Sequence, residues 1–220
     1  EKGLEPLADL LSKLPNGSVD TLAQPFVNDN VLTTEDALAG ARDILAERFA
    51  DEPSIREQLR TLTRKQGIVA TTAKNKELDE KQVFEMYYEY EEPVSRIVPH
   101  RTLAINRGEK EDILKVAIRL PIELATNAMT RKWLKTSQNE ASQQLQLAIE
   151  DSYKRLIQPA IEREIRNELT EKAEAQAIHI FAENLRSLLL QPPMRSKMVL
   201  GVDPAYRTGC KLAVVDETGK

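Results

Sequence analysis

The chain has 220 residues, with 31 basic and 35 acidic side chains and a formal net charge of −4. Its 41% hydrophobic content is enough for a core, but no apolar run reaches the roughly 18–20 residues of a membrane span. The single cysteine excludes an internal disulfide and a cysteine-based metal cluster. We therefore expect a soluble cytoplasmic protein, neither membrane-bound nor held by disulfides.

The first half of the chain is patterned mainly for helices. Thr33 followed three residues later by Asp36 is close to a capping box, so a helix is expected to begin there. Pro53 suits the first turn of the next helix. The short β-branched run 68–72 predicts a strand. A further helical face is predicted from apolar residues at helical spacing, namely Val83, Phe84, Tyr87 and Tyr88.

The second half contains another strand signal. Apolar and polar residues alternate between 113 and 120, which predicts a strand. We expect it to pair with 68–72, so that a small two-stranded inset (about 68–120) interrupts the helices. From Pro121 to Leu134 the spacing of apolar residues is helical again.

A long apolar stripe at mostly four-residue spacing extends from Leu145 to Leu189. Such a stripe turns slowly around a helix, so several neighbours are needed to cover it. We expect the N-terminal helices around 7–11 and 38–49 to be these neighbours, so that both ends of the chain would meet in one core. Pro159 has no amide hydrogen and should kink or restart the helix.

The last residues predict a β-hairpin with a carboxylate at the end of its first strand. An apolar run at 198–202 ends on Asp203, and a second apolar run follows at 210–216. We expect Asp216 to form a turn and Cys210 to be a buried structural residue. A lone hairpin is marginal in water, so these residues are expected to be a piece of a longer protein.

Four separated segments, in order, resemble the Tex family of bacterial transcription accessory proteins. They are GLEPLADLL from Gly3, EDALAGARDILAERF from Glu35, EPVSRIVPHRTLAINRGEKEDILKV from Glu92 and GVDPAYRTGCKLAVVDETGK from Gly201. In that family a helical framework holds a YqgF-like domain, helix-hairpin-helix elements and an OB-fold RNA-binding domain. The YqgF-like domain resembles the RNase H-like fold of Holliday-junction resolvases.

The resemblance implies a mainly α fold in two parts. Residues 1–194 would form the Tex-like central helical scaffold with its small β inset. Residues 195–220 would be the start of the YqgF/RNase H-like α/β domain, truncated after its first β-hairpin. The break at Gln191-Pro192-Pro193 is the place in the chain where a domain boundary is best supported.

Asp203 is the one residue with a specific catalytic interpretation. In the resolvase-like fold that the hairpin resembles, the first-strand aspartate helps to hold a divalent metal. A metal-dependent phosphodiesterase needs several carboxylates around its cations, and the others would come from later strands. We therefore expect no cofactor for these residues, with Mg²⁺ at Asp203 only in the intact protein. The competing interpretation is an aspartate that orders its loop.

Basic side chains are concentrated in the middle of the chain. Residues 93–135 carry nine basic and four acidic side chains, whereas residues 1–92 carry 11 basic and 19 acidic ones. Within the basic segment Arg101, Arg107 and Lys110 are candidates for salt-sensitive binding to a nucleic-acid backbone. Acidic residues dilute this cluster, so a solvated surface or a set of salt bridges is the competing interpretation.

Two smaller sets have weaker signals. Arg207 and Thr208 lie in the hairpin loop, where they could meet a phosphate or fix the loop. Three tyrosines could stack on bases or pack in the core, namely Tyr87, Tyr88 and Tyr90.

Two functions follow from these patterns. The first is a non-catalytic scaffold in an RNA- or DNA-binding transcription accessory protein, with the transcription machinery as a further partner and no membrane association. The alternative is a metal-dependent nuclease or resolvase-like enzyme in the intact protein. Acidic residues on the later strands of that protein would distinguish the two.

Overall fold

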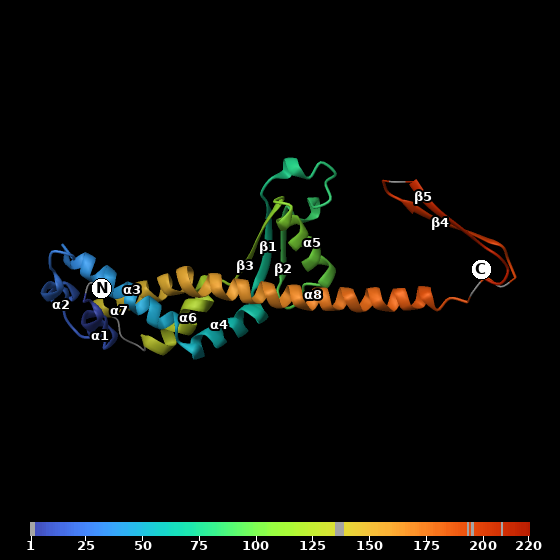
Figure 1. Ribbon diagram of the computed structural model, residues 1–220. Helices are drawn as coiled ribbons and strands as arrows, with labels where there is room; N and C mark the ends of the chain where they lie inside the picture. Colours follow the sequence, from blue (N-terminus) through green and yellow to red (C-terminus); the bar gives the residue numbers. More distant parts are fainter. Residues whose placement is uncertain (1–2, 135–138, 193, 195, 208) are drawn as a thin grey trace. The chain divides into compact units, whose positions relative to one another are not determined.

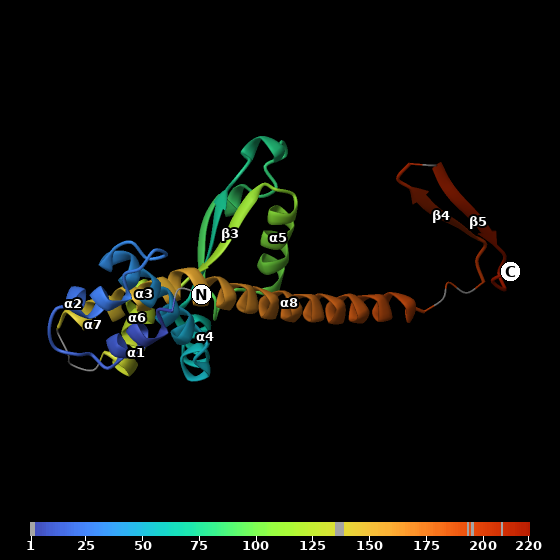
Figure 2. The ribbon, with the colours of Figure 1, turned by 60° about the vertical axis from the view of Figure 1, so that its left-hand side comes forward.

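The computed structural model describes residues 3–134, 139–192, 194, 196–207 and 209–220. The chain divides into two compact units, Glu1–Ala177 and Ile178–Lys220. The division falls inside one long helix, α8 (Gln158–Leu189), which Figures 1 and 2 show in orange. None of the described helices has both the length and the apolar character needed to cross a membrane.

The first unit begins with a layer of helices. Its elements are α1 (Glu5–Ser12), α2 (Val19–Ala23), η1 (Gln24–Phe26), α3 (Thr34–Ala50), α4 (Pro53–Gln66), α6 (Ile122–Trp133) and α7 (Glu140–Asp151). The predicted capping box is confirmed. The Thr33 hydroxyl accepts from the Asp36 amide at 3.0 Å, and the Asp36 carboxylate accepts from the Thr33 amide at 3.1 Å. Pro53 opens α4, as its lack of an amide hydrogen predicted.

The core of this layer joins the start of the chain to α7. Among its fully buried side chains are residues of α1, α3 and α7, namely Leu7, Leu11, Leu38, Leu45, Leu145 and Ile149. Asn139 ties the same regions together at the surface. Its Nδ2 donates to the carbonyl oxygens of Leu14 and Pro15 at 3.0 Å each, while its Oδ1 caps α7 through the Ser142 amide at 2.9 Å. The N-terminal helices therefore cover the α7 part of the predicted stripe. The expectation that both ends of the chain meet in one core was wrong, because Leu189 at the far end of the stripe is 73% exposed.

Between α7 and α8 the helical hydrogen bonds change to a π-helical segment, η4 (Ser152–Ile157). Pro159 is the second residue of α8, directly after this segment, and has no amide hydrogen to donate to it. The Ser152 hydroxyl donates to the Ala46 carbonyl of α3 at 2.7 Å, which fixes this segment to the helical layer. α-Helical hydrogen bonding therefore resumes at Gln158, beside Pro159, after a π-helical segment and without a break in the helical backbone.

The inset is a three-stranded antiparallel sheet in the order β2-β1-β3, formed by β1 (Ile68–Ala73), β2 (Glu89–Pro93) and β3 (Leu114–Arg119). The predicted pairing of the strand at 68–72 with the strand at 113–120 is confirmed, because β1 pairs with β3 and Ile68 lies opposite Arg119. The prediction of only two strands was wrong, since β2 pairs with the other edge of β1 through Thr72 and Glu89. α5 (Pro99–Lys110) lies beside the sheet, as Figure 2 shows.

The prediction of a helix with an apolar face at 83–88 was also wrong. This segment forms a 3₁₀ turn, η3 (Glu85–Tyr87), in the loop between β1 and β2, where η2 (Lys76–Leu78) precedes it. Phe84 and Tyr87 are buried, and the Thr71 hydroxyl of β1 donates to the Tyr87 carbonyl. The aromatic side chains therefore anchor a loop to the sheet, a role that their helical spacing did not reveal.

The second unit contains the end of α8 and the predicted hairpin, β4 (Val199–Ala205) and β5 (Gly209–Val215). Val199 pairs with Val215, and Asp203 pairs with Lys211. The hairpin ends in a turn at Asp216, whose Oδ1 accepts from the hydroxyl of Thr218 at 2.7 Å and from the amides of Thr218 at 2.8 Å and Lys220 at 3.0 Å. These hydrogen bonds, led by the Thr218 hydroxyl, lower the pKa of Asp216 and confirm its predicted role as a turn former.

Two expectations about burial were wrong. Cys210 is exposed on β5, because both faces of this hairpin are largely open. The apolar stripe of α8 is buried through Ile161, Ile165 and Ala173, but Phe181 is 67% exposed. The period of the sequence identifies an apolar face without showing what covers it.

Candidate functional site

The basic segment lies largely on α5, and Arg101 is in its first turn. The Arg101 guanidinium donates to Glu92 Oε1 on β2 at 2.8 Å, and this hydrogen bond raises the pKa of Arg101. The Tyr90 hydroxyl donates to the other Glu92 oxygen. Burial, with this hydrogen bond, raises the pKa of Tyr90 to about 12. The charge of Arg101 is therefore matched by a carboxylate of the same fold.

Arg107 and Lys110 are both exposed near the end of α5. Arg107 Nε donates to Glu111 Oε1 at 2.7 Å, and this hydrogen bond raises the pKa of Arg107. Arg101 turns toward β2, whereas Arg107 turns toward Glu111, so each guanidinium is paired with a different carboxylate. Their pairing favours the interpretation as salt bridges and a solvated surface.

The three tyrosines belong to the packing of the inset. Tyr87 is buried, and its ring meets the Tyr90 ring edge-on at 5.3 Å between centroids. The Tyr88 hydroxyl donates to Asp79 at 3.0 Å. Core packing is thus the interpretation that the structure supports.

Asp203 lies exposed on β4, opposite Lys211. Arg207 is exposed in the turn between the strands, and Thr208 lies outside the described residues. Across the part of the chain that the structure describes, no group of three or more histidine, cysteine, aspartate or glutamate side chains could hold a metal ion. Asp203 supplies one carboxylate, whereas Mg²⁺ prefers several oxygen ligands, so Mg²⁺ at Asp203 in the intact protein stays a prediction.

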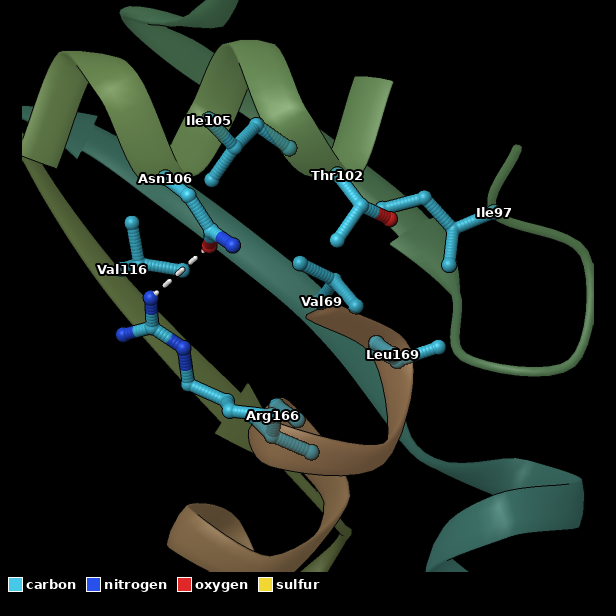
Figure 3. Close-up of a pocket in the computed structure, with 9 residues that line it drawn as sticks. Val69, Ile97, Thr102, Ile105, Asn106, Val116, Arg166 and Leu169 are labelled. Carbon is cyan, nitrogen blue, oxygen red and sulfur yellow. Dashed lines mark hydrogen bonds between the residues drawn. The ribbon is translucent and has the colours of Figure 1, made fainter. Parts of the chain in front are cut away.

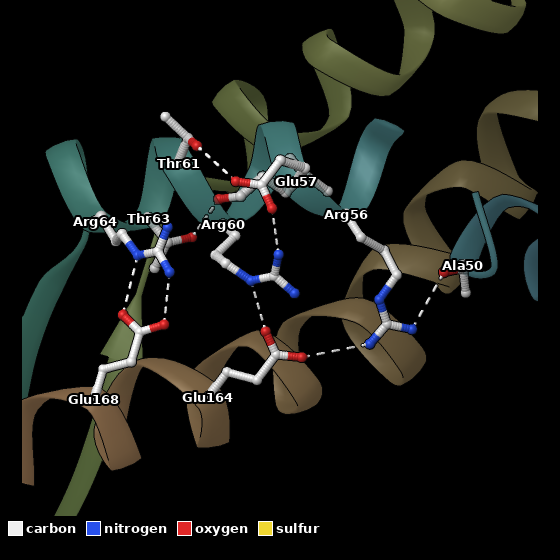
Figure 4. Close-up of polar contacts among 10 residues, drawn as sticks. Ala50, Arg56, Glu57, Arg60, Thr61, Thr63, Arg64, Glu164 and Glu168 are labelled. Atoms are coloured by element: carbon white, nitrogen blue, oxygen red, sulfur yellow. Dashed lines mark hydrogen bonds and ion pairs between the residues drawn. The ribbon is translucent and has the colours of Figure 1, made fainter. Parts of the chain in front are cut away.

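A row of ion pairs fixes the first half of α8 to α4 (Figure 4). Arg64 donates to both carboxylate oxygens of Glu168, at 3.0 and 2.6 Å. Arg60 Nε donates to Glu164 at 2.8 Å, and Arg56 lies 3.7 Å from the same carboxylate. The hydrogen bond from Arg64 lowers the pKa of Glu168. These five residues, here called the α4–α8 clamp, hold the two helices in one register.

The inset holds the same stretch of α8 from another side. The Ile118 amide on β3 donates to Glu162 at 2.9 Å, and Asn106 on α5 donates to Thr170 at 2.7 Å. Arg166 donates to Asn106 and to Glu109 of α5, at 3.2 and 2.8 Å. The contact between Arg166 and Asn106 is drawn in Figure 3.

A small cavity lies beside these contacts, between α5, the sheet and α8 (Figure 3). Apolar side chains form most of its wall, namely Val69, Ile97, Ile105, Val116, Ile118 and Leu169. Its volume of about 10 Å³ is room for no more than one water molecule. The contact of α8 with the inset is therefore close-packed, and this cavity is too small for a substrate.

The sequence analysis did not predict the α4–α8 clamp, although the spacing of its charged residues could have indicated it. Arg56, Arg60 and Arg64 recur every four residues, and so do Glu164 and Glu168. Residues four apart lie on the same face of a helix, so rows of opposite charge on two helices can form ion pairs when the helices lie side by side. Their separation by about a hundred positions hid the match.

The described contacts define a class of protein: a helical framework with a small α/β inset, in which one long helix is fixed from two sides. Comparison with known families then identifies it. The model of the Tex central region-like family matches residues 15–181, and that of the Tex protein YqgF-like domain matches residues 197–220. The chain belongs to the Tex family.

Individual relatives agree with this assignment. Over 223 residues the chain is 57% identical to the uncharacterized protein YdcI of Bacillus subtilis, covering 100% of the chain and 31% of the relative. It is 34% identical over 225 residues to the transcriptional accessory protein Tex of Neisseria gonorrhoeae, covering 100% and 30%. It is 32% identical over 232 residues to the human S1 RNA-binding domain-containing protein 1, covering 99% and 23%. The chain thus spans less than a third of each of these relatives.

Proposed function

We propose that these residues act as a non-catalytic scaffold within a nucleic-acid-binding, cytoplasmic transcription accessory protein. The scaffold comprises residues 1–194, and residues 195–220 open the YqgF-like domain. Its role is to hold flanking RNA- or DNA-binding domains at fixed positions. The names of two relatives, one a transcriptional accessory protein and the other an S1 RNA-binding domain-containing protein, support the choice of partner.

The fixation of α8 is the observation that carries this proposal. Its first half is held by the α4–α8 clamp on one side and by contacts with Asn106, Glu109 and Ile118 on another. The part of α8 within the first unit, residues 158–177, extends about 30 Å at 1.5 Å per residue. A helix that is rigidly held at one end can set the position of whatever follows it in the chain.

The test breaks α8 beyond its buried half in the intact protein. Gln176 is exposed and follows Ala173, the last buried residue of α8. Gln176→Pro removes a helical hydrogen bond and kinks the helix, while Gln176→Ala is the matched control. Binding is measured by fluorescence anisotropy with a short RNA that fits one domain and a long RNA that reaches several.

A scaffold predicts that Gln176→Pro weakens binding of the long RNA by about tenfold or more, because simultaneous engagement depends on geometry. Binding of the short RNA should stay unchanged. Equal affinities of both variants for the long RNA would refute the proposal.

The nuclease alternative has its own test in the intact protein. It requires cleavage of RNA or DNA that depends on Mg²⁺ or Mn²⁺ and disappears in Asp203→Asn. That result would replace the non-catalytic scaffold by a metal-dependent enzyme.

A further inference from the structure

The loop between α1 and α2, residues 13–18, contains the one Asn-Gly pair of the sequence, Asn16-Gly17. Both residues are exposed. The backbone nitrogen of the residue after an asparagine can attack the side-chain amide of that asparagine. Glycine permits this attack best, because it has no Cβ to obstruct the close approach. The pair is therefore a candidate for a chemical change of the loop itself.

The geometry at Gly17 leaves the attacking nitrogen accessible. Gly17 has a φ of 115°, and a Cβ built on it would have no heavy atom within 4 Å apart from its chain neighbours. No described residue accepts a hydrogen bond from the Gly17 amide. Base from the solvent can thus reach the amide proton, and loss of this proton makes the nitrogen a nucleophile.

The electrophile is Cγ of Asn16, the carbon of its side-chain amide. The Oδ1 atom bonded to this carbon accepts from Asn139 Nδ2 at 3.3 Å. Negative charge develops on Oδ1 when a nitrogen attacks Cγ, so a donor already directed at this oxygen favours the attack. The same Nδ2 donates to the Leu14 and Pro15 carbonyl oxygens, which ties the loop to the start of α7 directly before the reacting pair.

A second exposed asparagine, Asn30, provides a contrast within the same unit. The next residue is Val31, which is β-branched and only 1% exposed. The Val31 amide donates to the Asn28 carbonyl at 2.9 Å. A nitrogen that is held in a hydrogen bond and crowded by a branched, buried side chain is a poor nucleophile. Asn30 is therefore an internal reference for Asn16.

We propose that Asn16 is a site of spontaneous deamidation through attack by Gly17. The Gly17 nitrogen gives its proton to solvent base and forms a bond to Asn16 Cγ. The bond from Cγ to Nδ2 breaks, and the side-chain nitrogen takes up a proton and leaves as ammonia. Water then opens the resulting succinimide ring at either of its carbonyls, so the product is aspartate or isoaspartate. Either product carries a carboxylate in place of the neutral amide.

Isoaspartate changes the loop more than aspartate does, because its backbone runs through the former side chain and is longer by one carbon atom. The lengthened loop should disturb the hydrogen bonds from Asn139 to Leu14 and Pro15. Their loss would weaken the attachment of the loop to α7. This modification is separate from the scaffold role, and either proposal can fail without the other.

The test incubates the intact protein at neutral and at mildly alkaline pH. Peptide mapping by mass spectrometry then measures the fraction of each asparagine that is converted. We expect loss of the amide at Asn16 and its retention at Asn30, with both aspartate and isoaspartate present at position 16. Conversion should be faster at the higher pH, because the attack needs a deprotonated amide nitrogen.

Asn16→Gln is the matched variant, because glutamine keeps the amide but would have to form a larger ring. It should retain its side-chain amide under the same conditions. Position 16 is exposed, so the melting temperature before incubation should be unchanged. During incubation the melting temperature of the unaltered protein should fall as isoaspartate accumulates, whereas that of Asn16→Gln should stay constant.

Two results would overturn the proposed reaction. The first is conversion of Asn16 and Asn30 at the same rate. The second is aspartate as the sole product at position 16, since direct hydrolysis of the amide forms no isoaspartate. An unchanged melting temperature at high isoaspartate content would refute the proposed effect on the loop.

Discussion

Ile165→Ala tests whether the buried half of α8 is part of the core. Ile165 is 1% exposed. Its neighbours along the helix border two cavities of about 10 Å³ each, one lined by Ile161 and the other by Leu169. Packing on both sides is therefore close, and the surroundings have little free space into which to relax when the side chain is shortened.

The magnitude follows from the carbons removed. Losing three buried carbon atoms costs about 2.4 kcal/mol at about 0.8 kcal/mol each. The remaining cavity adds to this, so the cost should lie between about 2 and 5 kcal/mol. For a chain of this size each kcal/mol lowers the melting temperature by about 2–4 °C, so a fall of roughly 4–20 °C is expected.

Ile178→Ala is the matched control, because it makes the same change at a side chain of α8 that is 68% exposed. Its effect should stay within about 0.5 kcal/mol. Thermal and urea unfolding, followed by far-ultraviolet circular dichroism, measures both variants. Equal melting temperatures for Ile165→Ala and Ile178→Ala would refute the assignment of this face to the core.

Three further outcomes are expected. The pKa of Asp79 is lowered, because hydrogen bonds from Phe84, Val83 and Tyr88 outweigh the opposing effect of burial. The Asp79 carboxylate therefore stabilises the fold above about pH 4, the pKa of an aspartate in the unfolded chain, and this stabilisation is lost as the pH falls through the pKa of Asp79 in the folded protein. In Asp79→Asn, urea unfolding should show a weaker dependence of stability on acid pH. Purified 220-residue chain should not cleave DNA or RNA with Mg²⁺ or Mn²⁺, and cleavage abolished by Asp203→Asn would contradict this. Amides of the hairpin 199–215 should exchange faster than those of α3, since a two-stranded unit is marginal alone; slower exchange would show that it is held by packing.

Local signals predicted the elements that depend on local physics. Thr33 and Asp36 predicted the start of α3, because the hydrogen bonds of a capping box form within one turn of the helix. The alternation before Leu120 announced β3, because one face of the sheet is buried and the other is not. Pro159 predicted a change in the helix at this point, because proline has no amide hydrogen to donate.

Elements whose stability depends on residues far away in the sequence were not predicted. Strand β2 has the sequence EYEEP, and acidic residues and proline are depleted in strands. It exists because β1 supplies backbone partners and Arg101 neutralises Glu92. The same holds for the candidate site. The sequence showed the excess of basic residues at 93–135, but it did not show which carboxylates pair with Arg101 and Arg107.

Comparing the 220-residue chain with the intact protein tests the scaffold most directly. Anisotropy titrations with single- and double-stranded RNA and DNA, at two salt concentrations, give the affinities and their salt dependence. If nucleic-acid contacts lie mainly in flanking domains, the chain alone should bind at least about tenfold more weakly than the intact protein under each condition. Equal affinity, lost on Arg107→Ala with Lys110→Ala, would contradict the scaffold and make α5 the nucleic-acid interface.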